Sequence, residues 1–203
     1  MKLLSRSRRQ RSAQASVQSR IRRDVNTHTS IDLSKTQGLF IRALASSGAR
    51  FLVIGGKAMQ ALDVERDTVD VDIWVSRDEL TVESAFLTLK EFCGAPAVFR
   101  ERLREPSIRV PIPSERDPEI DILTSIADLP FDETYGAAID VTWQKLVLRV
   151  PNVNDMIRIK QIAIASTDSR IAAGEWNAVG VEEARRGIAR DEQDIALLRQ
   201  LKV

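Results

Sequence analysis

The chain has few of the residues that several common chemistries require. Its 203 residues include one cysteine, Cys93, and one histidine, His28. A single cysteine excludes an intramolecular disulfide and a multi-cysteine zinc site, and it fits a reducing compartment. A single histidine excludes a multi-histidine metal centre and argues strongly against a histidine-based catalytic triad.

Long apolar runs are also absent. No segment approaches the roughly 20 consecutive apolar residues of a membrane helix, and the N-terminus has no apolar signal region. Hydrophobic residues make up 43% and charged residues 29% of the chain, which is typical of globular proteins. The sequence therefore predicts a cytoplasmic protein without a membrane partner.

The formal net charge of +1 conceals an uneven distribution. Residues 1–30 carry eight basic groups and one acidic group, whereas the remainder carries 22 basic and 28 acidic groups. The segment has a net charge of +7 and the remainder of the chain a net charge of −6. Such a distribution is typical of proteins that contact a nucleic acid or another anionic partner. A solvated disordered tail is the simpler interpretation, and docking on an acidic protein or an organellar transit peptide are further alternatives.

Hydrophobic periodicity predicts an α+β fold, with one mixed sheet flanked by helices. We expect a basic extension over residues 1–30, a core over 31–150 and a C-terminal helical part over 151–203. Helices are expected over 33–47, 57–62, 78–93, 152–166 and 180–201, with a polar loop over 167–177. Strands are expected over 51–54, 69–75, 98–103, 108–112, 119–124, 141–143 and 146–150, the last two as a hairpin. Pro111 predicts that its strand lies at a sheet edge.

The most informative segment is FLVIGGKAMQALDVERDTVDVDIWV, residues 51–75. A buried strand ends in Gly55 and Gly56, a turn that lets backbone amides approach an anion closely. Further on, Asp70 and Asp72 are two residues apart on a second strand, so they face the same side while Val69, Val71 and Ile73 face the core. Adjacent carboxylates repel unless a cation lies between them, and Mg²⁺ prefers such hard oxygen ligands. A third carboxylate, Asp121, on another apolar strand would complete a two-metal site.

Together these residues resemble the GG…RxTxDxD pattern of the nucleotidyltransferase superfamily, whose members share the DNA polymerase β-like fold. The matching string is Gly55-Gly56 followed by Arg66-Asp67-Thr68-Val69-Asp70-Val71-Asp72. More narrowly, the chain resembles minimal bacterial nucleotidyltransferases that include AbiEii-type toxins. Residues 155–160 resemble the family's DLIxxK helix, and residues 190–195 resemble its late KDxxD helix start, with Arg190 in place of the usual lysine.

The resemblance implies transfer of an NMP from an NTP to an acceptor hydroxyl with two Mg²⁺ or Mn²⁺ ions. It implies a catalytic set of Asp70, Asp72, Asp121 and Lys160, the three aspartates being the metal ligands. The implied nucleotide-binding residues are Gly55, Gly56, Lys57, Arg66, Thr68 and Asp194. The basic extension favours RNA, such as tRNA, as acceptor, and the toxin resemblance implies a cognate antitoxin protein as a partner.

Each residue also has a simpler interpretation. A glycine pair is often only a tight turn, Arg66 can neutralise nearby aspartates, Lys160 can be an ordinary helix lysine, and Asp191 can cap the last helix. A non-catalytic nucleotide-binding partner of a toxin–antitoxin pair, or transfer to a protein or a small molecule, remain alternative functions. A phosphatase-type DxD motif is a third interpretation, and Trp74 in place of a threonine or valine argues against it.

Overall fold

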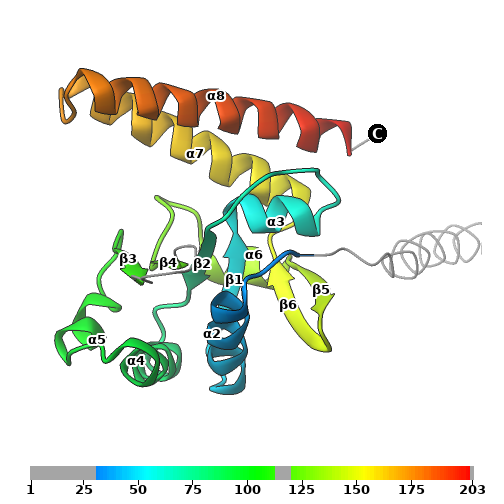
Figure 1. Cartoon of the computed structure of the whole chain (residues 1–203), viewed down its shortest axis with the longest axis vertical. Coiled ribbons are helices and arrows are strands. Elements are labelled where there is room, and N and C mark those ends of the chain that lie inside the picture. The colour runs from blue at the N-terminus through cyan, green and yellow to red at the C-terminus, as the bar shows by residue number, and fades with distance from the viewer. Residues whose placement is uncertain (1–30, 113–119, 202–203) are drawn as a thin grey trace, which may run out of the picture.

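The computed structural model describes residues 31–112 and 120–201, and the basic extension predicted for residues 1–30 lies outside them (Figure 1). Within the described residues the predicted α+β class is confirmed. A four-stranded mixed sheet, in the order β1-β2-β4-β3, has helices on both faces. None of the helices in these two ranges is long and apolar enough to cross a membrane.

The segment singled out in the sequence forms one edge strand and one central strand of the sheet. β1 (Phe51–Ile54) runs antiparallel to β2 (Val71–Val75), which runs parallel to β4 (Ile120–Leu123). β3 (Arg109–Ile112) pairs antiparallel with β4 at the edge, as Pro111 predicts. Val71 and Ile73 are fully buried as expected, but Val69 is 66% exposed because β2 begins only at Val71.

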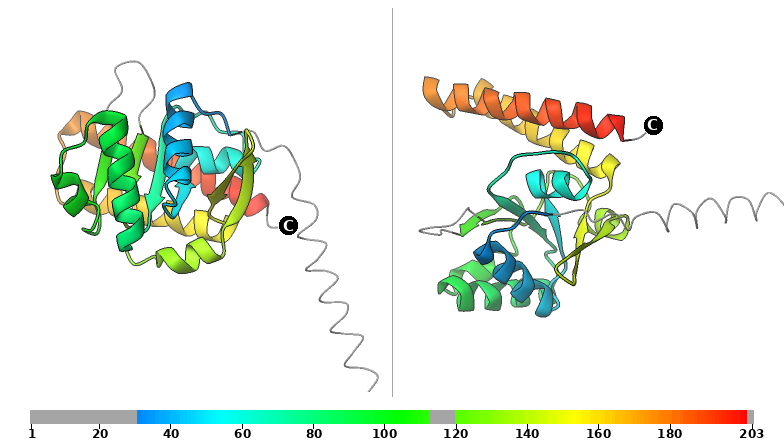
Figure 2. Two further views of the ribbon diagram at one scale, coloured as in Figure 1. Left: turned by 90° about the horizontal axis from the view of Figure 1, so that it is seen from below. Right: turned by 45° about the vertical axis from the view of Figure 1, so that its right-hand side comes forward.

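Helices form two layers around the sheet (Figures 1 and 2). α2 (Lys35–Ser46), α4 (Glu79–Cys93) and α5 (Val98–Arg102) cover one face. α3 (Gly55–Ala61), α7 (Val153–Ala172) and α8 (Ala178–Gln200) lie on the other, where α7 and α8 pack as a long hairpin. The short α6 (Phe131–Gly136) follows β4 and has no counterpart in the prediction.

Side-chain caps start the four longer helices. Ser34, Asp78, Asn152 and Asn177 each accept a hydrogen bond from a backbone N–H of the first turn. The sequence offers Asn152 or Asn154 as the cap of α7 and Ser30 or Asp32 as that of α2. Asn152 caps α7, whereas Ser34 caps α2 in a capping box with Gln37. Gln37 is itself buried and donates to the Val69 carbonyl at 2.8 Å, which ties α2 to the segment before β2.

The predicted hairpin is present but forms a sheet of its own. β5 (Ile139–Trp143) and β6 (Leu146–Val150) pair antiparallel, and β6 contacts β1. Gln144 and Lys145 have φ values of 44° and 69°, the left-handed backbone of a tight two-residue turn. The expectation of one sheet was wrong because the hairpin packs beside β1 without extending its hydrogen-bond ladder.

Two predicted elements were wrong. Residues 98–103 form helix α5 rather than a strand, because a turn at Pro96 and Ala97 starts it and Arg100 pairs with Glu83 on α4. Residues 167–172 continue α7 rather than forming a loop, since their polar side chains lie on the outer surface of the α7–α8 hairpin. The turn between the two helices follows, and an ion pair between Arg170 and Glu175 at 2.6 Å spans it.

Candidate active site

The glycine pair lies against the carboxylate strand. Ile54 is opposite Asp72 in the β1–β2 register, so the next residue, Gly55, lies beside the Asp72 side chain. Gly55 has φ +64°, and a Cβ there would lie 2.0 Å from Asp72 Oδ2. A Cβ on Gly56 would lie 2.7 Å from Thr68 Oγ1. Glycine is therefore required at Gly55 both by the backbone and by the approach of the carboxylate.

Two of the three predicted carboxylates are neighbours. Asp72 and Asp121 are directly opposite in the parallel β2–β4 pair, and residues opposite each other project from the same face of a sheet. Asp121 is 1% exposed and Asp72 is partly buried. Asp70 precedes β2 and is partly exposed. The structure thus brings together carboxylates that are far apart in the sequence.

The electrostatics of Asp72 reflect this crowding. Burial is the largest influence, and the negative charge of Asp121 is the next, so the pKa of Asp72 is raised to about 6. Arg109 and Lys160 act in the opposite direction, and Asp70 adds a smaller increase to the pKa. The direction of the shift therefore reflects burial first and the neighbouring carboxylate second.

Arg109 is a site residue that sequence reasoning missed. Its guanidinium forms an ion pair with Asp121 Oδ2. The other oxygen, Asp121 Oδ1, is buried and has no hydrogen-bond partner among the described residues. The signal was available in principle, because Arg109 lies two positions before Pro111, which pairs with Asp121. The sequence alone does not give the β3–β4 register, and without it Arg109 could not be placed near Asp121.

Lys160, Arg66 and Asp194, all predicted site residues, form a second charged group together with Asp191. Lys160 Nζ lies 2.6 Å from Asp191 Oδ1 and 2.7 Å from Asp194 Oδ2. Arg66 Nε lies 3.1 Å from Asp194 Oδ1. These contacts link the segment before β2 to α7 and α8. Asp191 lies inside α8, so the expectations that it caps the last helix and that residues 190–195 start a helix were wrong.

The side chain of Lys57 contacts the backbone of Thr68. Lys57 is buried, and its Nζ donates to the Thr68 carbonyl at 3.0 Å. Burial lowers the pKa of Lys57, and the charges of Asp32 and Asp70 partly oppose that decrease. The contact holds the segment before β2 against α3, so it positions Asp70 and Asp72 as well as the lysine itself.

The arrangement of the carboxylates decides whether they fit a divalent cation. Within residues 31–112 and 120–201, no three His, Cys, Asp or Glu side chains are grouped so as to hold a metal ion. Mg²⁺, however, is usually bound by one or two carboxylates together with waters and substrate phosphates. Asp72 and Asp121 provide such a pair, and Asp121 Oδ1 is an oxygen without a partner in the described chain. The pair therefore fits Mg²⁺ or Mn²⁺ that is shared with a phosphate-bearing ligand.

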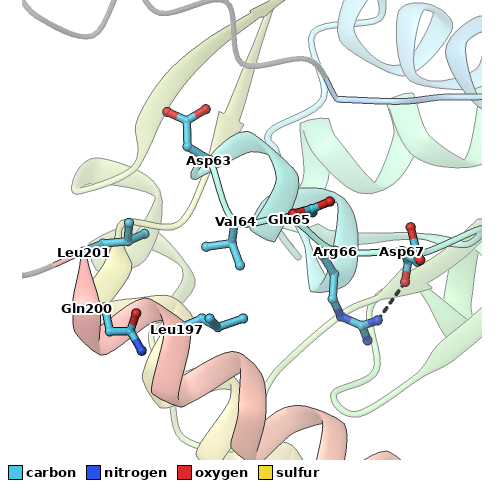
Figure 3. A pocket seen from close by; sticks show the side chains of 8 residues that line it. All are labelled: Asp63, Val64, Glu65, Arg66, Asp67, Leu197, Gln200 and Leu201. Carbon is cyan, nitrogen blue, oxygen red and sulfur yellow. Dashed lines mark hydrogen bonds between the residues drawn. The ribbon is translucent and has the colours of Figure 1, made fainter.

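A cavity of about 510 Å³ lies at a different place, between residues 63–67 and the end of α8 (Figure 3). Asp63, Glu65 and Asp67 line one side, while Val64 and Leu197 supply apolar surface. Arg66, which also lines it, is engaged by Asp194 and by the Asp67 carbonyl. Three acidic side chains would repel a triphosphate, so we place the candidate site at Asp72 and Asp121 and not in this cavity.

Comparisons with known proteins give limited similarity. No family model and no curated protein matches the chain. Among solved structures, it is similar to a solution structure of the antibiotic-resistance factor ANT(2'')-Ia, with a TM-score of 0.40 and 14% identity over 83% of this chain and 91% of that one. It is also similar to a crystal structure of ANT(2'')-Ia in complex with adenylyl-2''-tobramycin, with a TM-score of 0.36 and 14% identity over 83% of this chain and 100% of that one.

Proposed function

We propose that the chain is a metal-dependent nucleotidyltransferase that moves an NMP from an NTP to an acceptor hydroxyl. The observation that carries the proposal is the pairing of Asp72 with Asp121 on adjacent parallel strands, beside a glycine that leaves room for the carboxylate. An incompletely neutralised carboxylate pair at a glycine turn is the arrangement that a phosphate-bound divalent cation would complete. The resemblance of residues 55–72 to the nucleotidyltransferase pattern supports the same chemistry.

Asp72 and Asp121, with Asp70 as the third carboxylate, would hold Mg²⁺ or Mn²⁺, two ions in the complete site. When bound, the ions would neutralise charge on the triphosphate and lower the pKa of the attacking hydroxyl. The reaction joins the acceptor oxygen to the α-phosphorus, and the bond from that phosphorus to the pyrophosphate oxygen breaks. Asp121 is our candidate to accept the hydroxyl proton, and the backbone of Gly55 and Gly56 is our candidate to approach the phosphates.

The other predicted site residues have one of two proposed roles, either neutralising the triphosphate or positioning the nucleotide-binding segment. Lys160 influences the pKa of Asp72 and is held by two α8 carboxylates, so its ammonium is fixed in place before any ligand binds. We propose that Lys160 and Arg66 neutralise the triphosphate from these fixed positions. Lys57, Thr68 and Asp194 are proposed to position the nucleotide-binding segment through the contacts described above.

Transfer itself is the first test. The full chain is incubated with each labelled NTP, Mn²⁺ and total RNA, beside an Asp70→Ala/Asp72→Ala variant. We expect label on RNA with the wild type and a loss of at least about a thousandfold in the variant, because both carboxylates would act directly at the reacting phosphate. If the RNA, protein and small-molecule fractions all remain unlabelled, the result would contradict the enzyme proposal and would favour a nucleotide-binding partner protein.

We propose that the acceptor is RNA. The net charge of +7 in residues 1–30 supports this proposal, because basic residues bind the phosphates of a nucleic acid. A variant that lacks residues 1–30 is compared with the full chain for RNA binding and for NTP binding. We expect RNA binding to fall steeply and NTP binding to persist. Unchanged RNA binding would contradict this role of the basic extension, and label on protein would move the proposal to nucleotidylation of a protein.

A toxin role is proposed only on the family resemblance. Induced expression in a bacterial host is expected to arrest growth with the wild type and not with the Asp70→Ala/Asp72→Ala variant. A cognate antitoxin would relieve the arrest. Growth arrest by both forms would exclude transfer as its cause.

A further inference from the structure

The carboxylate pair already has a cation of its own. Arg109 is opposite Leu123 in the β3–β4 register, and Leu123 lies two residues after Asp121 on β4. The two side chains therefore project from the same face of the sheet as diagonal neighbours. The Arg109 guanidinium pairs with Asp121 Oδ2.

The two partners differ sharply in burial. The Asp121 side chain is 1% exposed, whereas the Arg109 side chain is 66% exposed. A buried carboxylate requires a counter-charge, because leaving it unpaired away from water is costly. Arg109 thus supplies counter-charge to the buried Asp121 from an exposed position.

The Arg109 guanidinium by itself neither balances the two carboxylate charges nor pairs with all of the Asp121 oxygens. It brings a single positive charge to a place where Asp72 and Asp121 lie side by side, and Asp121 Oδ1 still has no hydrogen-bond partner in the described residues. Lys160, a second nearby cation, is already engaged at 2.6 Å and 2.7 Å by Asp191 and Asp194. A divalent cation would neutralise both carboxylates at once, but it requires the same oxygens that Arg109 approaches.

We propose that Arg109 is the resident counter-ion of the Asp72–Asp121 pair and that it competes with the divalent cation for these carboxylates. This inference rests on the proposed metal-dependent function. In the metal-free protein Arg109 reduces the repulsion within the pair. A cation alone must displace it, whereas a cation that arrives with a triphosphate brings oxygen ligands of its own and displaces it more readily. Arg109 thereby makes metal binding depend on the nucleotide.

The test is a titration of the full chain with Mn²⁺ alone, with free Mn²⁺ followed by electron paramagnetic resonance. Arg109→Gln is expected to bind Mn²⁺ with a Kd roughly tenfold lower than the wild type, because a nearby positive charge has been removed from a partly buried site. Arg149→Gln is the matched control. It removes the same charge from a pair with Asp140 on the separate β5–β6 hairpin, and its Kd should stay close to that of the wild type.

Arg109→Gln also takes a partner from a buried carboxylate, so unfolding is measured in parallel. Competition predicts that Mn²⁺ raises the Tm of Arg109→Gln by more than it raises that of the wild type. Arg109→Lys keeps a positive charge and is expected to have a Kd between the two. A Kd for Arg109→Gln that equals or exceeds the wild-type value, with equal Tm shifts, would overturn the inference and leave the proposed function standing. Absence of Mn²⁺ binding in every form, both with and without an added NTP, would overturn both.

Discussion

Two groups of charged side chains among the described residues are each built around buried carboxylates, and their charges are balanced differently. Arg66, Lys160, Asp191 and Asp194 form two positive and two negative partners with separations of 2.6–3.1 Å. At the sheet, Asp72 and Asp121 lie beside the guanidinium of Arg109, and within residues 31–112 and 120–201 one oxygen of Asp121 has no hydrogen-bond partner. The first group is complete within the chain and joins α7 and α8 to the segment before β2. The second has an excess of negative charge, which is the property of a site that receives a cation from outside.

The largest expected effect comes from unbalancing the complete group. Lys160→Met leaves Asp191 without its lysine, and Asp194, which is 2% exposed, with only Arg66. Removal of one partner from a buried ion network is strongly destabilising, so we expect a loss of about 3 kcal/mol in the free energy of unfolding, measured with urea. Lys90→Met, at an exposed position on α4, is the control and should change stability by less than about 0.5 kcal/mol. A loss under about 1 kcal/mol for Lys160→Met would show that the group is not a structural link.

Gly55 tests how closely the carboxylate group is packed. Gly55→Ala and Gly48→Ala both place alanine at a positive φ, +64° and +79°, and both should lose about 1 kcal/mol for that reason. A Cβ at Gly48 meets nothing within 4 Å, whereas a Cβ at Gly55 would lie 2.0 Å from Asp72 Oδ2. We expect Gly55→Ala to be less stable than Gly48→Ala by about 2 kcal/mol in urea unfolding, because the added methyl group overpacks the site. Equal losses would mean that Asp72 moves aside without cost.

The pH dependence of stability distinguishes the carboxylate group from an ordinary ion pair. The pKa of Asp72 is raised from 3.8 to about 6, so between these values the folded protein retains a proton that the unfolded chain has lost. Folding stability should therefore fall as pH rises from about 4 to about 6, the opposite of a carboxylate with a depressed pKa. Urea unfolding in the presence of EDTA is compared for the wild type and Asp72→Asn. We expect Asp72→Asn to become the more stable of the two as pH rises through this range, and a constant difference would contradict the crowding of Asp72.

The smallest effect is expected at the exposed side of the balanced group. Arg66→Gln removes a contact of 3.1 Å to Asp194, but Lys160 still neutralises that carboxylate. We expect a loss of about 1–2 kcal/mol in urea unfolding, smaller than that of Lys160→Met. Arg186→Gln on α8, whose pair with Glu182 is exposed, is the control and should lose less than about 0.5 kcal/mol. If Arg66→Gln costs as much as Lys160→Met, the two cations act as one unit.

The sequence was sufficient to predict the three strands β1, β2 and β4. The apolar run Phe51–Ile54 is β1 as expected, and the alternation at Val71 and Ile73 places Asp72 on the opposite side from the core. Asp121 is predicted by the same argument, since it interrupts an apolar strand, and β4 does lie next to β2. These features are local patterns with a period of two, which a single sequence records directly.

What the sequence did not reveal depends on register and tertiary packing. Arg109 reaches Asp121 only because β3 pairs with β4 as it does, and Asp191 reaches Lys160 only because α8 packs along α7. The α7–α8 hairpin also explains the error over residues 167–172, whose polar composition is typical of a loop but suits the outer surface of a long helix. The short pattern of residues 98–103 predicts a strand, and contacts with α4, which a single sequence does not record, accompany the helix instead.

The parallel pairing of β2 with β4 has a consequence for how the protein folds. The chain between these strands passes through α4, α5 and β3 before it returns, so the pairing closes a long loop. Such non-local contacts are slow to form because the entropy of loop closure is lost before the strands gain anything in return. Asp72 and Asp121 become neighbours only at that step. We therefore expect a partly folded chain, even one with its helices formed, to lack the carboxylate pair until the last strands have joined.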